Sequence, residues 1–371
     1  MIRILHSVSY MSRGGIETML MNYYRNIDRS KVQFDFLCNA PFEGAYDEEI
    51  RQLGGRIFRS PGYSPLKRFA YKRFMGQLFE EHPEYKIVEA HNDGVGAFTL
   101  EAAKKAGVPV RIYHAHSTGF PHDFKFPIKY YCKLMLRSWC NKHFACGDDA
   151  AAYFFGEEIR KNGDYSLICN AIDLDKFKFD PELRNSIRRK YGLENRFVIG
   201  HVGRFATVKN HLRMVDIMKE LKTRNHNVAL MLVGTGELMD SVKQKVTEDG
   251  LSDSVVFVGE VAEPHLFYQA FDLFLMPSLY EGLPLTGVEA QASGLPAIFS
   301  KTVPPEIDLT GHCEFIDLSE PDSVWAGRIA GIMSEGEIRY DNYDILTSKN
   351  YNIKVEAGKL QNMYLSLQDL K

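Results

Sequence analysis

Short apolar runs rich in β-branched residues alternate along the chain with stretches whose apolar residues recur every three or four positions. The runs predict strands at 2–8, 33–37, 86–90, 110–113, 142–145, 197–202, 228–233, 255–258, 273–276 and 297–299. The helical spacing is clearest at 15–27 and 211–221. Strands that alternate with helices form right-handed βαβ units, so we expect parallel sheets with helices on both faces.

The alternation pauses near residues 171–195 and then restarts with a strand. A chain of 371 residues also exceeds one comfortable core. We therefore predict an α/β fold of two facing Rossmann-like domains, 1–172 and 173–349, with a cleft between them. The helical pattern at about 350–371 is expected to pack back on the first domain. Ligands of such sheets bind outside the carboxyl ends of the strands.

The composition is that of an ordinary globular protein, with 45% hydrophobic residues, 25% charged residues and a net charge of −3. No apolar span reaches the roughly 20 residues of a transmembrane helix, and we expect no signal peptide at the N-terminus. The six cysteines are scattered without metal-ligand spacing, which favours reduced thiols. We expect a cytoplasmic protein that binds no nucleic acid.

Two carboxylates stand in the segment 281–294, EGLPLTGVEAQASG. Pro284 favours the first turn of a helix, so the amides of the next residues should be free to bind an anion. Gly287 would let a ligand approach the backbone. Glu289 lies just inside this helix among small side chains, where an unpaired buried charge is costly. We expect it to accept ligand hydroxyls; a solvated or dipole-compensating glutamate is the alternative.

The loop that opens the second half of the chain carries two cations. Arg204 and Lys209 follow Gly203 in the sequence GRFATVK. A guanidinium fork and an ammonium group suit a pyrophosphate, although two solvated surface cations would be the simpler interpretation. The anion site is favoured because the acidic segment should converge with them. The next strand ends at Gly234, whose loop we expect to pack beside the nucleotide.

A glycine loop follows the first strand. Gly14 and Gly15 precede a helix that has Glu17 in its first turn. This loop could receive a substrate, although a plain strand–helix connection fits the same residues.

Histidines follow two further strands of the first half. His114 and His116 share one face by alternation, and His91 begins the sequence HND at 91–93. Histidine exchanges hydrogen bonds and protons near neutral pH. We identify no compelling third ligand for a metal there, so we expect no metal site.

In this order, these motifs resemble the retaining glycosyltransferases of family 4, which have the GT-B fold of two facing Rossmann-like domains. The resemblance covers nearly the whole chain and is nearest to bacterial enzymes of capsular polysaccharide and exopolysaccharide biosynthesis. Its most specific parts are E-x7-E at 281–289 with GLP at 294–296, and GR-x4-K at 203–209.

The resemblance implies a role for each matching residue. Glu289 would bind the ribose hydroxyls of a nucleotide-sugar, and Glu281 would bind hydroxyls of the donor sugar. Arg204 and Lys209 would hold the diphosphate, and His116 would lie beside the transferred sugar. The other implied donor contacts are Gly14, Gly15, Gly203, Gly234, Val261, Leu283, Leu285 and Thr286, and the implied acceptor contacts are Glu17, His91 and His116. Thr286 departs from the family pattern, in which a bulkier aliphatic residue is common.

The resemblance further implies transfer of a hexose or N-acetylhexosamine from a UDP-linked donor to a saccharide or lipid-linked acceptor. We expect no Asp-rich metal motif such as Asp-x-Asp, so Arg204, Lys209 and the helix terminus would stabilise the leaving diphosphate in place of a divalent metal. We expect no cofactor. Front-face attack and double displacement both stay open. The rival functions are a UDP-sugar 2-epimerase of the same fold and a non-catalytic scaffold that binds nucleotide-sugars.

Two segments, 63–74 and 124–140, mix aromatic and basic residues. In the second, Lys129, Lys133 and Arg137 fall four apart on one face of a predicted helix. Such a surface could lie on the anionic cytoplasmic face of the plasma membrane, or it could be a solvated face over a packed helix.

Overall fold

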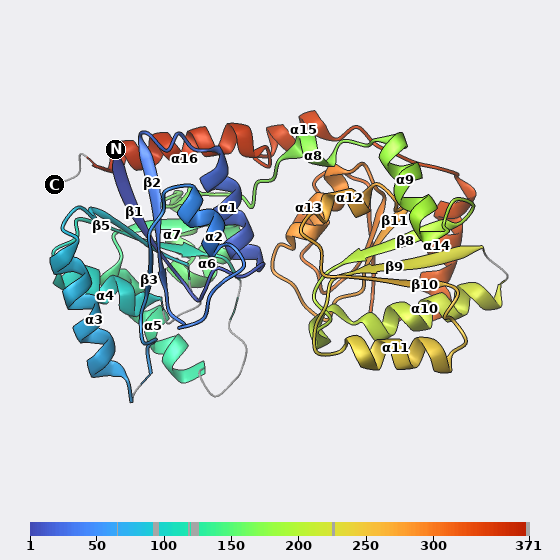
Figure 1. The fold of residues 1–371 in the computed structure, drawn as a ribbon, viewed down its shortest axis with the longest axis horizontal. Coiled ribbons are helices and arrows are strands. Elements are labelled where there is room, and N and C mark those ends of the chain that lie inside the picture. Colours follow the sequence, from blue (N-terminus) through green and yellow to red (C-terminus); the bar gives the residue numbers. More distant parts are fainter. Residues whose placement is uncertain (65, 92–95, 118, 120–125, 225–226, 369–371) are drawn as a thin grey trace. The chain divides into compact units, whose positions relative to one another are not determined.

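A computed structural model describes residues 1–371 except 65, 92–95, 118, 120–125, 225–226 and 369–371 (Figure 1). The chain forms two compact units, one made of Met1–Ile172 with Asn350–Lys371 and the other of Asp173–Lys349. Each unit is built on its own sheet, in which the assigned strand pairs are parallel. The structure thus confirms the α/β class and the pair of Rossmann-like sheets.

The first unit contains a sheet with the strand order β3-β2-β1-β4-β5-β6-β7. The strand β1 fixes the register of its two neighbours, because its Ile4 pairs with Phe34 of β2 on one side and with Ile87 of β4 on the other. The bounds are β1 Ile2–Val8, β2 Val32–Cys38, β3 Ile57–Arg59, β4 Ile87–Ala90, β5 Val110–Ala115, β6 Lys142–Ala145 and β7 Ser166–Leu167.

Two groups of helices sandwich this sheet. Helices α1 (Gly15–Asn26) and α16 (Ile353–Gln368) pack against each other and share a core with Phe34 of β2 (Figure 1). The other face is covered by α3 Arg68–Glu81, α4 Ala97–Lys105, α5 Phe126–Trp139 and α6 Asp148–Phe155. The remaining helices are α2 Asp47–Gln52 and α7 Glu157–Asn162. The last helix of the chain therefore completes the core of the first unit.

The second unit contains a sheet with the order β10-β9-β8-β11-β12-β13. Its strands are β8 Phe197–Val202, β9 Val228–Val233, β10 Val255–Gly259, β11 Leu273–Met276, β12 Ala297–Ser300 and β13 Cys313–Ile316. Helices α10 (His211–Thr223), α11 (Met239–Glu248) and α14 (Asp322–Ser334) share a core with this sheet. The others are α8 Leu174–Phe177, α9 Pro181–Tyr191, α12 His265–Tyr268, α13 Leu285–Ala292, α15 Tyr343–Ser348 and the 3₁₀ turns η1 Thr207–Lys209 and η2 Pro305–Ile307.

Each sheet has one point at which the direction of strand succession reverses. These points lie between β1 and β4 in the first unit and between β8 and β11 in the second. Loops diverge there at the carboxyl ends of the strands and leave room for a ligand. No helix in the described part of the chain has an apolar stretch long enough to cross a membrane.

Candidate functional site

The predicted donor residues of the second unit follow four neighbouring strands of its sheet. Arg204 and Lys209 follow β8, Gly234 follows β9, Val261 follows β10, and the acidic segment follows β11. Because the strands are parallel, their carboxyl ends meet at the same edge of the sheet. The predicted groups are therefore collected at one edge, around the point where the strand order reverses.

Lys209 and Glu281 form an ion pair at this edge. The Lys209 Nζ donates to Glu281 Oε1 over 2.7 Å, and only 17% and 12% of the two side chains are exposed. The backbone holds the two loops together, since Leu279 N donates to Val208 O over 2.8 Å. The Asn210 side chain adds a hydrogen bond to Pro277 O over 3.0 Å. Sequence reasoning assigned the cation and the carboxylate to separate parts of a ligand, and the structure shows them bonded to each other.

Arg204 is the more exposed of the two cations. Its guanidinium Nη2 lies 3.1 Å from Glu237 Oε2 on the loop after β9, and 74% of its side chain is exposed. A surface ion pair of this kind contributes little energy, so the guanidinium can turn toward a phosphate at low cost. Glu237 was not predicted, because a glutamate in a polar turn has no distinguishing pattern.

Helix α13 begins at Leu285 with Pro284 as its N-cap, as predicted. The prediction of free amides was wrong at Gly287, whose N–H donates to Pro284 O over 3.0 Å. The reason for this glycine also differs from the prediction. A β-carbon there would lie 3.0 Å from the Ile307 Cγ1 atom and 3.2 Å from the Phe299 ring, so the glycine permits close packing of α13 on the sheet. Leu283 lies in the loop before the helix.

Glu289 is buried, with 7% of its surface exposed. The Tyr268 hydroxyl donates to its Oε2 over 2.7 Å, and no cation pairs with it among the described residues. Burial raises the pKa of Glu289 to about 7, although the Tyr268 hydrogen bond opposes the shift. The nearby Thr286 Oγ1 is buried without a hydrogen-bond partner in the described structure. Both groups are thus suited to donors or acceptors supplied by a ligand.

Two glycines let the loops of this edge pack against each other. Gly234 has φ +133°, and a β-carbon there would overlap the Gly203 carbonyl oxygen. A β-carbon on Gly203 would lie 2.8 Å from His201 Nε2, and the Gly203 N–H donates to Val233 O over 3.0 Å. The Gly234 loop therefore packs against the Gly203 loop and holds the backbone beside Arg204. Its place beside the nucleotide stays a prediction.

The first unit contains a chain of hydrogen-bonded histidines at the carboxyl ends of its central strands. His6 Nδ1 lies 3.0 Å from His91 Nε2, and His91 Nδ1 lies 3.0 Å from His116 Nε2. The rings of His114 and His116 stack with centroids 4.0 Å apart, which confirms that they share a face. His116 is only half-buried and forms the end of the chain nearest the surface.

A buried glutamate anchors these histidines. Glu89 Oε1 lies 2.9 Å from His114 Nδ1 and 3.4 Å from His91 Nε2, and Tyr364 of α16 donates to Glu89 Oε2 over 2.5 Å. Burial lowers the pKa of His114 to about 3 and holds those of His91 and His116 well below their usual range, so the rings are neutral. A neutral His91 carries one ring proton, so it donates to one of His6 and His116 and accepts from the other. Neither Glu89 nor Tyr364 was predicted.

The expectation that no third ligand lies near the two histidines was wrong. One candidate atom from each of His91, His114 and His116 lies within 4.8 Å of the others, and the same holds for His6, Glu89 and His91. Imidazole groups in such an arrangement could hold a transition-metal ion. Asn92 and Asp93 of the predicted HND motif, and Thr118 after the histidine pair, lie outside the described residues.

The glycine loop of the first unit leads directly into α1. Gly14 is the N-cap and Gly15 the first residue of the helix, and Thr18 N donates to Gly14 O over 2.9 Å. Glu17 is half-buried in the first turn, and burial raises its pKa. A β-carbon on Gly15 would meet nothing within 4 Å, so the loop is open at this point.

The expectation that the chain has no Asp-x-Asp motif was wrong, because the triplet Asp173–Leu174–Asp175 stands where the second unit begins. Asp173 is the N-cap of α8, and Asp175 lies 2.8 Å from the Lys178 ammonium in the same turn. Asp175 thus takes part in a local ion pair in α8, a helix that packs against α12 and α13.

The aromatic and basic segments differ from each other in the structure. On α5, the cations predicted to share an exposed face contact the protein: Lys133 Nζ lies 3.6 Å from the centre of the Tyr153 ring, and Arg137 donates to Phe155 O. Arg137 is still exposed on that helix, together with Tyr130, Tyr131 and Leu134. In the first segment, Lys67, Arg68, Lys72 and Arg73 are exposed at the start of α3. Pro65, Phe124 and Lys125 lie outside the described residues.

Comparisons with known proteins show the family to which this chain belongs. Residues 184–337 match the family described as glycosyl transferases group 1, and residues 14–150 match the glycosyl transferase 4-like domain. The putative glycosyltransferase EpsF of Bacillus subtilis (strain 168) is 37% identical over 369 residues, which are 98% of this chain and 96% of that protein. The chain belongs to the group 1 glycosyltransferases. This confirms the resemblance to family 4 that the sequence motifs suggested.

Two other relatives of this glycosyltransferase also match it over nearly its whole length. An Escherichia coli UDP-Gal:alpha-D-GlcNAc-diphosphoundecaprenol alpha-1,3-galactosyltransferase is 30% identical, over 99% of this chain and 97% of that protein. The capsular polysaccharide biosynthesis glycosyltransferase CapH of Staphylococcus aureus is 25% identical, over 99% of each chain. The fold matches that of Anabaena Alr3699/HepE, solved with UDP-glucose, with a TM-score of 0.81, 20% identity and coverage of 99% and 100%.

Proposed function

We propose that this glycosyltransferase transfers a hexose or N-acetylhexosamine from a UDP-sugar to a saccharide or lipid-linked acceptor in polysaccharide biosynthesis. The observation that carries the proposal is the Lys209–Glu281 pair beside the buried Glu289 at one edge of the second sheet. The relatives support it, since one is a UDP-galactose-dependent transferase with a diphosphoundecaprenol acceptor and CapH acts in capsular polysaccharide biosynthesis.

The donor fits this edge by the chemistry of its parts. The ribose has two neighbouring hydroxyls, which can donate to the carboxylate of Glu289 and favour its ionised form. Lys209 and Arg204 supply positive charge for the diphosphate, and Glu281 accepts hydroxyls of the sugar while it orients Lys209. Backbone groups of Leu283, Leu285 and Thr286 line the sugar, and Val261 reads the base.

The reaction breaks the bond between the anomeric carbon and the diphosphate oxygen and joins that carbon to the acceptor oxygen. Negative charge develops on the leaving UDP, and preorganised cations stabilise it without reorganisation. We propose that the configuration is retained and that the leaving phosphate takes the proton of the acceptor hydroxyl. Lys209 and Arg204 replace a divalent metal in this step. His116 contacts the transferred sugar, with Glu17 and His91 on the acceptor side and Gly14–Gly15 over the donor phosphate.

The acceptor side is proposed to meet an anionic membrane surface through the start of α3. Lys67 and Arg68 carry positive charge there, and the first turn of the helix holds no acidic residue. Phe69 and Leu66 project beside them, with 76% and 96% of their surfaces exposed. Basic and apolar groups that lie together favour the interface of an anionic leaflet.

Purified protein incubated with UDP-glucose, UDP-galactose and UDP-N-acetylglucosamine tests the donor proposal. We expect release of UDP from at least one donor when a saccharide or diphosphoprenyl acceptor is present, and loss of release in Glu281→Ala. Interconversion of the UDP-sugar without an acceptor would indicate the epimerase instead. Binding without turnover for every acceptor would favour a scaffold.

Two further measurements test the chemistry. Proton NMR of the product should show the anomeric configuration of the donor, and an inverted product would contradict retention. Activity should persist in excess EDTA, and a loss restored by added Mn²⁺ or Zn²⁺ would contradict metal independence. Flotation with anionic vesicles should fall in Lys67→Glu/Arg68→Glu but not in the matched surface pair Arg189→Glu/Lys190→Glu of α9.

A further inference from the structure

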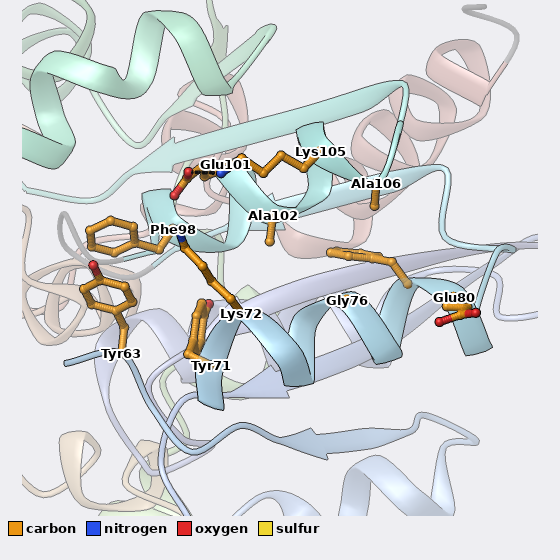
Figure 2. Close-up of a pocket in the computed structure, with 11 residues that line it drawn as sticks. Tyr63, Tyr71, Lys72, Gly76, Glu80, Phe98, Glu101, Ala102, Lys105 and Ala106 are labelled. Carbon is orange, nitrogen blue, oxygen red and sulfur yellow. Dashed lines mark hydrogen bonds and ion pairs between the residues drawn. The ribbon is translucent and has the colours of Figure 1, made fainter. Parts of the chain in front are cut away.

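A pocket of about 410 Å³ opens between α3 and α4 in the first unit. Figure 2 shows the two helices side by side, with Tyr63, Tyr71 and Phe98 at one end of the pocket and Glu80 at the other. A volume of this size lies within the range of roughly 300–1,000 Å³ that is typical of small-molecule sites.

The wall of the pocket is apolar and held in place. The rings of Tyr63 and Phe98 stack with centroids 3.6 Å apart, and Tyr63 meets Tyr71 edge to face. The Tyr71 hydroxyl forms a hydrogen bond with Thr99 Oγ1 over 2.9 Å. A ligand in the pocket therefore need not supply a polar partner for this hydroxyl. Phe79 is buried in the middle of the pocket. These fixed rings suit a hydrocarbon.

A glycine keeps the pocket open. Gly76 lines the pocket from the middle of α3, where glycine destabilises a helix relative to alanine. No backbone strain explains it, because its φ is that of an ordinary helix, and a β-carbon would meet nothing within 4 Å. A larger side chain at this position would project into space that the pocket now provides.

The charges at the rim are arranged unevenly. Lys105 is paired with Glu101, whereas Lys72 has no carboxylate partner among the described residues. Lys72 lies at the end that adjoins the basic start of α3, and Glu80 lies at the other end, about 12 Å along the helix. An anionic group therefore fits beside Lys72, and an apolar chain attached to it can run past Gly76.

We propose that this pocket binds one hydrocarbon chain of an anionic membrane lipid, with the lipid head group beside Lys72. The inference deepens the proposed membrane contact and rests on it for the source of the chain. The exposed Leu66 and Phe69 reach the apolar layer beside the same helix end, so the lipid enters where the helix meets the leaflet.

Calorimetric titration of the full-length protein with dodecyl phosphate below its micellar concentration tests the pocket. We expect saturable binding of one molecule, weakened at least tenfold by Gly76→Leu, which fills the pocket. Gly358→Leu is the matched control, because Gly358 is an exposed glycine within α16 where a β-carbon also meets nothing within 4 Å. Both substitutions raise helix propensity, so neither should unfold the protein.

Ala102→Phe fills the same pocket from α4. It tests the pocket a second time if Gly76→Leu has a folding defect. Unchanged binding in both filled variants, or equally strong binding of inorganic phosphate alone, would overturn the inference. UDP binding should be unaffected by Gly76→Leu, since none of the proposed donor residues lines this pocket.

Flotation with vesicles separates the inference from the membrane contact beneath it. Anionic vesicles should bind the wild-type protein more tightly than Gly76→Leu. Equal binding of the two proteins would leave the membrane contact in place and overturn chain uptake. Failure of the wild-type protein to bind anionic vesicles would refute the membrane contact. It would also refute a membrane lipid as the source of the hydrocarbon chain.

Discussion

The Lys209 ammonium donates to the Glu281 carboxylate over 2.7 Å, although the two residues lie on loops that follow different strands. The pair is largely shielded from water, so each charge depends on the other. It also keeps the cation at the strand edge before a diphosphate arrives. Preorganisation of this kind lowers the barrier for loss of an anionic leaving group.

A double-mutant cycle in Lys209→Met and Glu281→Gln should show this dependence. Each single change leaves a partner unpaired, so we expect a coupling of about 0.5–3 kcal/mol in the free energy of unfolding. Urea denaturation of the four proteins measures it. Additive effects would mean that the pair contributes nothing to the fold. Transfer activity should fall by about 10²–10³-fold in Lys209→Met, because a stabilising charge on the leaving group is lost.

Donor binding should depend on pH through Glu289. Its pKa in the free protein is raised from the ordinary 4.5 to about 7, so ionising Glu289 lowers stability as the pH rises through that window. Ribose hydroxyls donate to the ionised form, so the affinity for UDP should rise with pH between 5.5 and 7.5. Calorimetry in buffers of different ionisation enthalpy should also show proton release on binding.

Tyr268→Phe is the control for this pH dependence. It removes the hydrogen bond that favours the ionised carboxylate, so the midpoint of the affinity curve should move to higher pH. An affinity that is flat with pH in the wild-type protein would exclude Glu289 as a ligand of the ribose.

Gly234→Ala should destabilise the second unit by about 1–3 kcal/mol and weaken UDP binding, because the residue has φ +133° and its new methyl group would overlap the Gly203 carbonyl. Gly331→Ala is the comparison: it lies within α14, where an added β-carbon meets nothing within 4 Å, and should stabilise by up to about 1 kcal/mol. Thermal unfolding of both variants provides the measurement. Equal melting temperatures would contradict the packing of the two loops.

Glu89→Gln should lower the turnover number without changing the affinity for UDP. The amide is a poorer acceptor for His114 and Tyr364, so the histidine chain loses the group that sets its tautomers. We expect about a tenfold decrease, in keeping with about 1–3 kcal/mol for a disturbed buried hydrogen bond. Steady-state kinetics separate the turnover number from KM. Tyr364→Phe should have a smaller effect, because it removes one hydrogen bond and leaves the carboxylate.

Much of the fold follows from the hydrophobic pattern. Each predicted strand forms, because buried parallel strands are continuous apolar runs such as VALMLV in β9. The missed strands β3, β7 and β13 have two to four residues and lie at or next to the edges of the sheets. They extend a sheet that already exists, so their own sequences need little apolar character.

The site was predictable where its residues follow strands and less so where partners come from elsewhere. Lys209 and Glu281 lie in loops after β8 and β11, and Glu289 lies in the helix that follows the second loop. The place of all three at the sheet edge follows from the βαβ pattern. Tyr268 and Tyr364 reach carboxylates from helices, and nothing in their local sequences separates them from core tyrosines. Gly287 was misjudged because close packing on Ile307 and an open approach for a ligand both select glycine.

The account depends most on where the nucleotide-sugar binds. A crystal structure of this glycosyltransferase with UDP-glucose should place the ribose hydroxyls on Glu289 and the diphosphate beside Lys209 and Arg204. A nucleotide bound at any other edge, with Glu289 and Lys209 untouched, would contradict it.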